Sequence, residues 1–200
     1  MINFKSGFIT MLALFYLNVL MAQKYYEPGY VVLLNNDTVY GKVKDRTPEP
    51  FGELFEKIRF RDEGLFKKTY GPRDLKAYQI GDRQYESHFV EAQAALDIAF
   101  FEMFKGSGSQ IFLKVRQKGA LSYYHEEWRD PDSGYYDWHA YFKKASDSRF
   151  EFIRITLFGY NKKKMRAYLK DCPYLVKLLD DGGDPSLIDI VTLYNSKCAD

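Results

Sequence analysis

Three pairs of β-prone segments follow one another between residues 30 and 90, and a short polar turn separates the two members of each pair. The first pair, 30–34 and 38–43, flanks Asn35-Asn36-Asp37, and Asn and Asp tolerate left-handed backbone angles and close tight turns with their own side chains. The other two pairs are 54–60 with 65–70 and 75–80 with 84–90. Such consecutive hairpins predict an antiparallel framework whose first ribbon is the 29–43 segment, with Asp37 shaping its turn.

The middle of the chain continues this meander. Further strands are expected at 110–116, 120–128, 135–143 and 150–158. The segment 91–104 is ambiguous, because 91–96 favours helix by propensity whereas 98–104 fits a strand, which we expect for this second half. The Gly106-Ser-Gly-Ser109 turn lacks the Gly-Lys-Ser/Thr of a phosphate-binding loop, and a flexible turn is expected there.

The character of the chain changes after Gly159. Apolar residues recur at helical spacing, and Asp171-Cys-Pro173 and Asp184-Pro185 are typical helix starts. We therefore expect an α+β fold that is mainly antiparallel β, a small barrel, roll or sandwich of successive hairpins, closed by a C-terminal helical hairpin. Residues 23–200 are expected to form this single domain, with the C-terminal helices at about 161–198.

The N-terminal residues 1–22 have the three parts of a secretory signal peptide. Lys5 precedes the apolar run 8–20, and Ala22 supplies a small residue at the expected cleavage site. A transmembrane anchor is the rival interpretation, but thirteen helical residues span only roughly 20 Å of a hydrocarbon core of about 30 Å. We expect an exported protein of the periplasm or cell surface, without a transmembrane anchor after signal cleavage.

Charge and cysteine content restrict the classes of function. The formal net charge is +2, and near neutrality argues against a nucleic-acid partner, because such proteins concentrate positive charge on one face. Cys172 and Cys198 are the only cysteines, and in an oxidising compartment a disulfide is a more natural role for them than a zinc site, which needs three or four ligands. The pairing itself stays open, because the second helix is expected to be a turn longer than the first.

Two groups of residues are candidates for a functional site. His125, Glu126, Glu127 and His139 contain the parts of a metal-dependent or acid/base hydrolase, but their spacing lacks the H-E-x-x-H arrangement, and acids beside a histidine on an exposed strand are common. The second group is aromatic and surrounds the 129–134 loop: Tyr123, Trp128, Tyr135, Trp138 and Tyr141. Exposed Tyr and Trp rings can stack on sugars or anchor a protein, although strand alternation buries part of any such cluster. Lys143-Lys144 and Lys162-Lys-Lys164 are candidates for attracting an anionic surface, but we expect a solvated helix face.

Several segments together resemble a group of exported proteins from Bacteroidetes-type bacteria. They are Met21-Ala-Gln23, Gly29-Tyr-Val-Val with the 36–43 segment, the 168–175 segment Tyr-Leu-Lys-Asp-Cys-Pro-Tyr-Leu, and the 190–195 segment Ile-Val-Thr-Leu-Tyr-Asn. The resemblance covers both ends of the chain, implies a source and a compartment, and transfers no catalytic residues.

The leading hypothesis is an exported, non-enzymatic structural or binding protein of the bacterial cell envelope. Its partner would be an envelope protein or a glycan, and no cofactor is expected. The alternatives are the hydrolase at His125, Glu126, Glu127 and His139, and a carbohydrate-binding module built from the aromatic cluster at 123–141.

Overall fold

The computed structural model describes residues 26–46, 57–62, 64, 66–93, 100–102, 109–129 and 136–199. The strands are β1 Glu27–Leu33, β2 Thr38–Lys44, β3 Ile58–Arg61, β4 Lys67–Tyr70, β5 Leu75–Ile80, β6 Arg83–Gln93, β7 Phe100–Glu102, β8 Ser109–Gln117, β9 Leu121–Arg129, β10 Tyr136–Lys144, β11 Glu151–Ile153, β12 Ile155–Thr156 and β13 Gly159–Tyr160. The helices are α2 Lys162–Tyr168, α3 Pro173–Asp180 and α4 Leu187–Lys197. The expected signal peptide, 1–22, lies outside the described residues.

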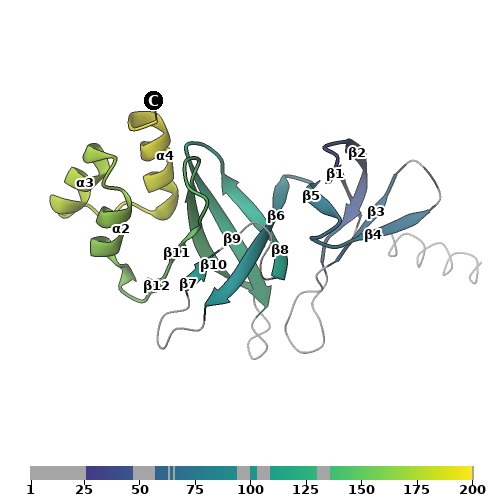
Figure 1. Ribbon diagram of the computed structural model, residues 1–200, viewed down its shortest axis with the longest axis horizontal. Helices are drawn as coiled ribbons and strands as arrows, with labels where there is room; N and C mark the ends of the chain where they lie inside the picture. Colours follow the sequence, from purple (N-terminus) through teal and green to yellow (C-terminus); the bar gives the residue numbers. More distant parts are fainter. Residues whose placement is uncertain are drawn as a thin grey trace, which may run out of the picture.

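Within the described residues the main sheet has eleven strands in the order β11-β10-β9-β8-β6-β5-β1-β2-β3-β4, with β7 paired to β6. All of its pairings are antiparallel. The three helices lie at the β11 end, and β1 to β4 lie at the other end (Figure 1). The expected class, mainly antiparallel β with C-terminal helices, is confirmed. The sheet is open, however, with β11 and β4 as its ends, so it is not a closed barrel.

The β1–β2 hairpin follows the turn chemistry of its sequence. Asn36 has a positive φ of 75°, which Asn adopts at lower cost than most residues. The Asp37 backbone N–H donates to Asn35 Oδ1 at 3.1 Å, and the Asn35 amide donates to the Asp37 carboxylate at 2.6 Å. Asp37 therefore does shape the turn, as expected.

The structure resolves one segment that the sequence left ambiguous, and it differs from one expected element. Residues 91–93 continue β6 as strand, because they pair with β7, and this pairing overrides the helix propensity of the segment. The single strand expected at 150–158 divides into β11 and a small hairpin, β12–β13. In that hairpin the Thr156 hydroxyl donates to the Gly159 carbonyl at 2.9 Å and accepts from Phe158 N–H at 3.2 Å. Gly159 has a φ of 83°, which favours glycine.

Two apolar cores lie on the same face of the sheet. The strand register places alternate residues of β9 and β10, among them Tyr123, Ala140 and Phe142, on the face that the helices cover. The helices contribute, among others, Leu175 and Ile190 to this core. A second core fills the β1–β6 half of this face, and a smaller cluster that includes Tyr141 lies on the opposite face.

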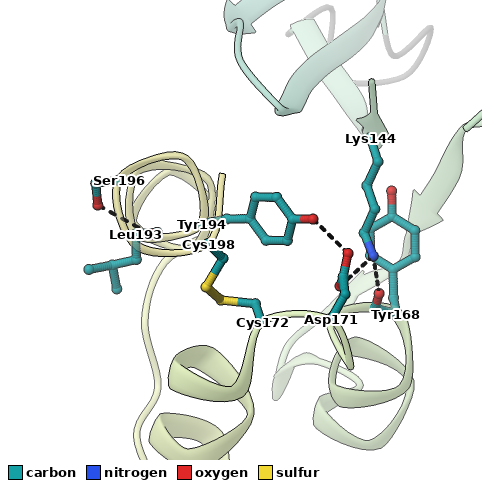
Figure 2. The surroundings of a disulfide bond; sticks show 8 residues. All are labelled: Lys144, Tyr168, Asp171, Cys172, Leu193, Tyr194, Ser196 and Cys198. Atoms are coloured by element: carbon teal, nitrogen blue, oxygen red, sulfur yellow. Dashed lines mark hydrogen bonds and ion pairs between the residues drawn. A yellow bond between two sulfur atoms is a disulfide. The ribbon is translucent and has the colours of Figure 1, made fainter. Parts of the chain in front are cut away.

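The helices are fixed to the sheet and to one another by a disulfide and a polar contact (Figure 2). Cys172 and Cys198 form the disulfide that the sequence left open, joining the start of α3 to the end of α4. Beside it, the Lys144 ammonium donates to the Asp171 carboxylate at 2.6 Å, and the Tyr194 hydroxyl donates to that carboxylate at 2.7 Å. Among the described residues no helix has the length and apolar character needed to span a membrane.

Candidate functional site

The residues of the hydrolase hypothesis are divided between two faces of the sheet. In the β9–β10 register Glu126 lies opposite His139 and His125 lies opposite Ala140. Because successive side chains of a strand point to opposite faces, His125 and Glu127 share one face, and Glu126 and His139 share the other. The four residues therefore form two pairs on opposite faces of the sheet and do not converge on one site. In the described part of the chain no three His, Cys, Asp or Glu side chains are grouped to hold a metal ion.

His125 is buried in a packed aromatic environment. Its Nε2 is hydrogen-bonded to the Tyr123 hydroxyl at 2.7 Å, and its ring stacks on Trp138 with centroids 4.0 Å apart and planes within 2°. Burial, helped by the positive charges of Arg116 and Lys114, lowers the pKa of His125 to about 3. The imidazole is therefore neutral near pH 7, and its ring is held by packing.

The two glutamates have structural partners. Glu126 accepts a hydrogen bond from the Tyr141 hydroxyl at 2.7 Å and lies 3.5 Å from His139 Nδ1. Glu127 accepts from Lys114 at 2.6 Å and from the Tyr85 hydroxyl at 3.0 Å, and lies 3.6 Å from the Arg46 guanidinium. We call the last group, Glu127 with Lys114, Tyr85 and Arg46, the Glu127 cluster. Its contacts cross from the end of β2 to β6, β8 and β9, and so connect distant parts of the sheet.

The aromatic candidates fall into three structural situations. Tyr123 and Tyr141 are buried, with 5% and 0% of their surface exposed, and this corrects their assignment to a binding surface, because strand alternation points both rings into packed clusters. Trp138 is 38% exposed. Tyr135 and the side chain of Trp128 lie outside the described part of the structure.

Trp138 borders a hollow of about 400 Å³ at the start of β10. Asp137, His139 and Arg154 contribute polar groups to its wall, and Phe152 and Ile155 contribute apolar ones. The Trp138 indole ring, whose orientation is fixed by stacking on His125, thus lies at the edge of a polar hollow. Among the described side chains of the predicted aromatic cluster, Trp138 is the one that is exposed.

A larger cavity, of about 510 Å³, separates the end of the sheet from the first C-terminal helix. We call it the α2 cleft. Strand β11, the β12–β13 hairpin and helix α2 form its walls, with apolar surface from Phe152, Ile153, Phe158, Tyr160, Met165 and Tyr168. Its volume lies within the range of about 300–1,000 Å³ that small-molecule sites occupy.

Two polar groups in this wall lack full solvation. The Tyr168 hydroxyl is buried and has no hydrogen-bond partner among the described residues. Burial raises the pKa of Glu151 above its usual value, although Lys164, which also lines the cleft, opposes that rise. A buried hydroxyl without a partner carries a desolvation cost of about 1–3 kcal/mol. The cleft therefore combines an apolar wall with a lining residue, Tyr168, whose buried hydroxyl is unsatisfied.

Local sequence chemistry positions the cleft walls. Helix α2 begins because the Asn161 side chain accepts a hydrogen bond from Lys164 N–H at 3.1 Å and caps the helix. Lys144 donates to the Tyr168 carbonyl at 2.7 Å and so ties the end of α2 to β10. On the other wall, the Tyr160 hydroxyl donates to the Pro185 carbonyl at 2.9 Å, which orients its ring.

The sequence did not predict this cleft, because 150–158 was expected to be one strand and Lys162-Lys-Lys164 a solvated helix face. An available indication was the pair of bulky apolar residues Leu157-Phe158 immediately before Gly159, because a turn at that glycine places both at a hairpin tip rather than in a strand. The sequence around Tyr168 gave no indication of the cleft, because the absence of a hydrogen-bond partner for its hydroxyl depends on the packed structure.

Comparison of the chain with protein-family models, with curated proteins and with solved structures found no match. Function therefore has to be argued from the geometry of the α2 cleft and its surroundings.

Proposed function

We propose that this chain is an exported, non-enzymatic binding protein of the bacterial cell envelope that holds an amphiphilic small molecule in the α2 cleft. The observation that carries the proposal is a cavity of about 510 Å³ with an apolar wall and an unsatisfied Tyr168 hydroxyl. The ligand class that suits it has an apolar body and one hydrogen-bonding head group, as a fatty acid has.

The chemistry of the wall supports this class of ligand. Phe152, Ile153 and Met165 would cover an apolar body, and its removal from water would supply most of the affinity. A head group beside Tyr168 would give the hydroxyl the partner that it lacks. Lys164 at the same cleft would favour a head group with negative charge.

The exported location and the non-enzymatic role have support of their own. The signal-like segment 1–22 and the disulfide between Cys172 and Cys198 are both typical of a protein that leaves the reducing cytosol. His125, the buried histidine of the rival hydrolase hypothesis, is held neutral between Tyr123 and Trp138.

Calorimetric titration with dodecanoic acid tests the proposal. We expect saturable binding that Tyr168→Phe weakens about five-fold, because one neutral hydrogen bond contributes ~1 kcal/mol. Tyr78→Phe is the matched control: it removes a buried tyrosine hydroxyl outside the cleft lining, one bonded to Asp45 at 2.7 Å, and should lower stability while leaving the affinity unchanged. No saturable binding, or equal affinity of the Tyr168→Phe and wild-type proteins, would contradict the proposal.

A second candidate function, binding of a glycan, is favoured by the Trp138 hollow. A flat indole ring beside Asp137 and Arg154 combines a stacking surface with hydrogen-bonding groups, which is the combination that sugar rings require. Titration with muropeptides released from peptidoglycan checks this candidate. Trp138→Ala should abolish any binding there and leave dodecanoic acid binding intact.

A further inference from the structure

The turn of the β12–β13 hairpin carries two bulky apolar side chains that no other part of the described structure covers. Leu157 is 101% exposed and Phe158 is 98% exposed, and the adjacent Ile155 is 46% exposed. We call these three residues the hairpin tip. Leu157 and Phe158 are exposed to water at the end of a short hairpin, so their packing does not stabilise the fold. Contiguous exposed apolar groups of this kind are typical of contact sites.

The chain around the hairpin tip is strongly basic. Residues 149–170 contain one acid, Glu151, and these basic residues: Arg149, Arg154, Lys162, Lys163, Lys164, Arg166 and Lys170. Lys162 pairs with Asp184 at 3.0 Å and Arg166 pairs with Asp180, so two of these charges are compensated by acids of the following segment. The excess of positive charge is confined to this segment, because Asp171, Asp180, Asp181 and Asp184 follow it in the chain.

The register of the hairpin sets the apolar and basic groups at different depths. Ile155 pairs with Tyr160, so Arg154 and Asn161 flank the base of the hairpin, and α2 with its lysines begins directly after it. Leu157 and Phe158 lie two residues or so beyond this base, roughly 7 Å at 3.3 Å per residue. An apolar group of an interfacial protein reaches about 5–10 Å into the headgroup and acyl boundary, while basic groups remain at the headgroups.

We propose that the hairpin tip docks this protein on an anionic phospholipid surface, with Leu157 and Phe158 inserted below the headgroups and the surrounding Arg and Lys side chains at the phosphates. Phe158 also lines the α2 cleft, so docking would bring the cleft to the lipid surface. The inference goes beyond ligand binding and does not require the cleft to be occupied.

Flotation of the purified protein with lipid vesicles tests the inference. We expect binding to vesicles of equal phosphatidylglycerol and phosphatidylcholine to exceed binding to phosphatidylcholine alone by about ten-fold or more, and to weaken as salt is added. The double variant Leu157→Ser with Phe158→Ser should lose about ten-fold of that binding, because the inserted apolar area is removed. Phe66→Ser is the matched control: Phe66 is also highly exposed, at 81%, but precedes β4 at the opposite end of the sheet, and its variant should bind as the wild type does.

A second pair of variants tests the charge. Lys163→Glu should weaken binding several-fold, whereas Lys67→Glu, on exposed strand β4, should leave it unchanged. Because Leu157 and Phe158 are almost fully exposed in the described structure, thermal unfolding of the double variant should match that of the wild type. No vesicle binding by the wild type, binding that is unaffected by the hairpin-tip variant, or equal binding to both kinds of vesicle would overturn the inference. A variant that instead loses a cross-linked envelope protein, with no change in vesicle binding, would also overturn it and assign the tip to a protein partner.

Discussion

At the scale of single residues, the environment of a side chain decides its chemistry more than its type does. His125 was the natural general base of a hydrolase, yet it is surrounded by Tyr123 and Trp138 and by the positive charges of Arg116 and Lys114. Burial and these two positive charges disfavour the imidazolium form. A neutral, stacked imidazole is a packing group.

We predict that His125 stays neutral across the range in which exposed histidines titrate, about pH 5 to 8. Its folded-state pKa of about 3 lies below the ordinary value of 6.5, so the folded chain binds fewer protons than the unfolded one between those values. The contribution of His125 to the free energy of unfolding is fully present above its unfolded-state pKa. It is lost as the pH falls towards its folded-state pKa. Imidazole ¹⁵N chemical shifts followed by NMR measure this directly, with an unstructured peptide of the same local sequence as the control. Protonation of His125 in the folded protein within that range would contradict the prediction.

Part of the candidate site could be anticipated from the sequence at this scale. Alternation along β9 and β10 predicted that some rings of the aromatic cluster are buried, and Tyr123 and Tyr141 are. Tyr123 is buried on the face that the helices cover and Tyr141 in the cluster on the opposite face, and short-range patterns do not specify that both faces are packed. The unsatisfied hydroxyl of Tyr168 depends on contacts with several elements at once, so no local pattern could predict it.

At the scale of elements, turn chemistry was the most reliable guide. Asn35-Asn36-Asp37 specified the first hairpin, and the polar turns at 81–83 and 117–120 separate strands much as expected. The pattern failed where pairing decides the conformation. Residues 91–93 are strand because β7 lies beside them, and the 150–158 segment is broken because Thr156 and Gly159 close a turn at its C-terminal end.

The disulfide between α3 and α4 should make a large contribution to stability. Cys172 and Cys198 are separated by 26 residues, and the chain-entropy model assigns about 3 kcal/mol to a loop of that length. The double variant Cys172→Ser with Cys198→Ser should therefore unfold at a lower denaturant concentration, and its free energy of unfolding should be lower by about 3 kcal/mol. Reduced wild-type protein is the control and should show the same loss, whereas an oxidised protein with two titratable thiols would contradict the pairing.

At the scale of the whole molecule, one sheet serves two apolar cores, and the Glu127 cluster connects them. The helices complete the core on β9–β11, while β1–β6 enclose the other. Arg46 and Lys114 both direct cationic groups at the Glu127 carboxylate from separate parts of the chain. The order of strands along the sheet could not be predicted from the sequence, because it depends on pairings between distant segments, such as β1 with β5 and β6 with β8.

Removal of the central charge of this cluster should destabilise the whole fold. Glu127→Gln leaves Lys114 without its anionic partner and leaves Arg46 with Asp45 alone, which costs on the order of 3 kcal/mol. Asp82→Asn, at an exposed position in the β5–β6 turn, is the matched control and should change stability by less than about 0.5 kcal/mol. Denaturant unfolding followed by circular dichroism gives both values, and equal stability of the two variants would refute the connecting role of Glu127.

The α2 cleft is proposed to hold an amphiphilic small molecule, and mass spectrometry of organic extracts from the protein purified out of its native cells tests this most directly. Lys164→Trp places a bulky ring at a lining position of the cleft, and Lys163→Trp makes the same change at the neighbouring exposed position outside the lining. The wild type and Lys163→Trp should release the same amphiphile in near-stoichiometric amount, and Lys164→Trp should release far less. An extract without any such molecule, or equal amounts from all three proteins, would contradict the claim.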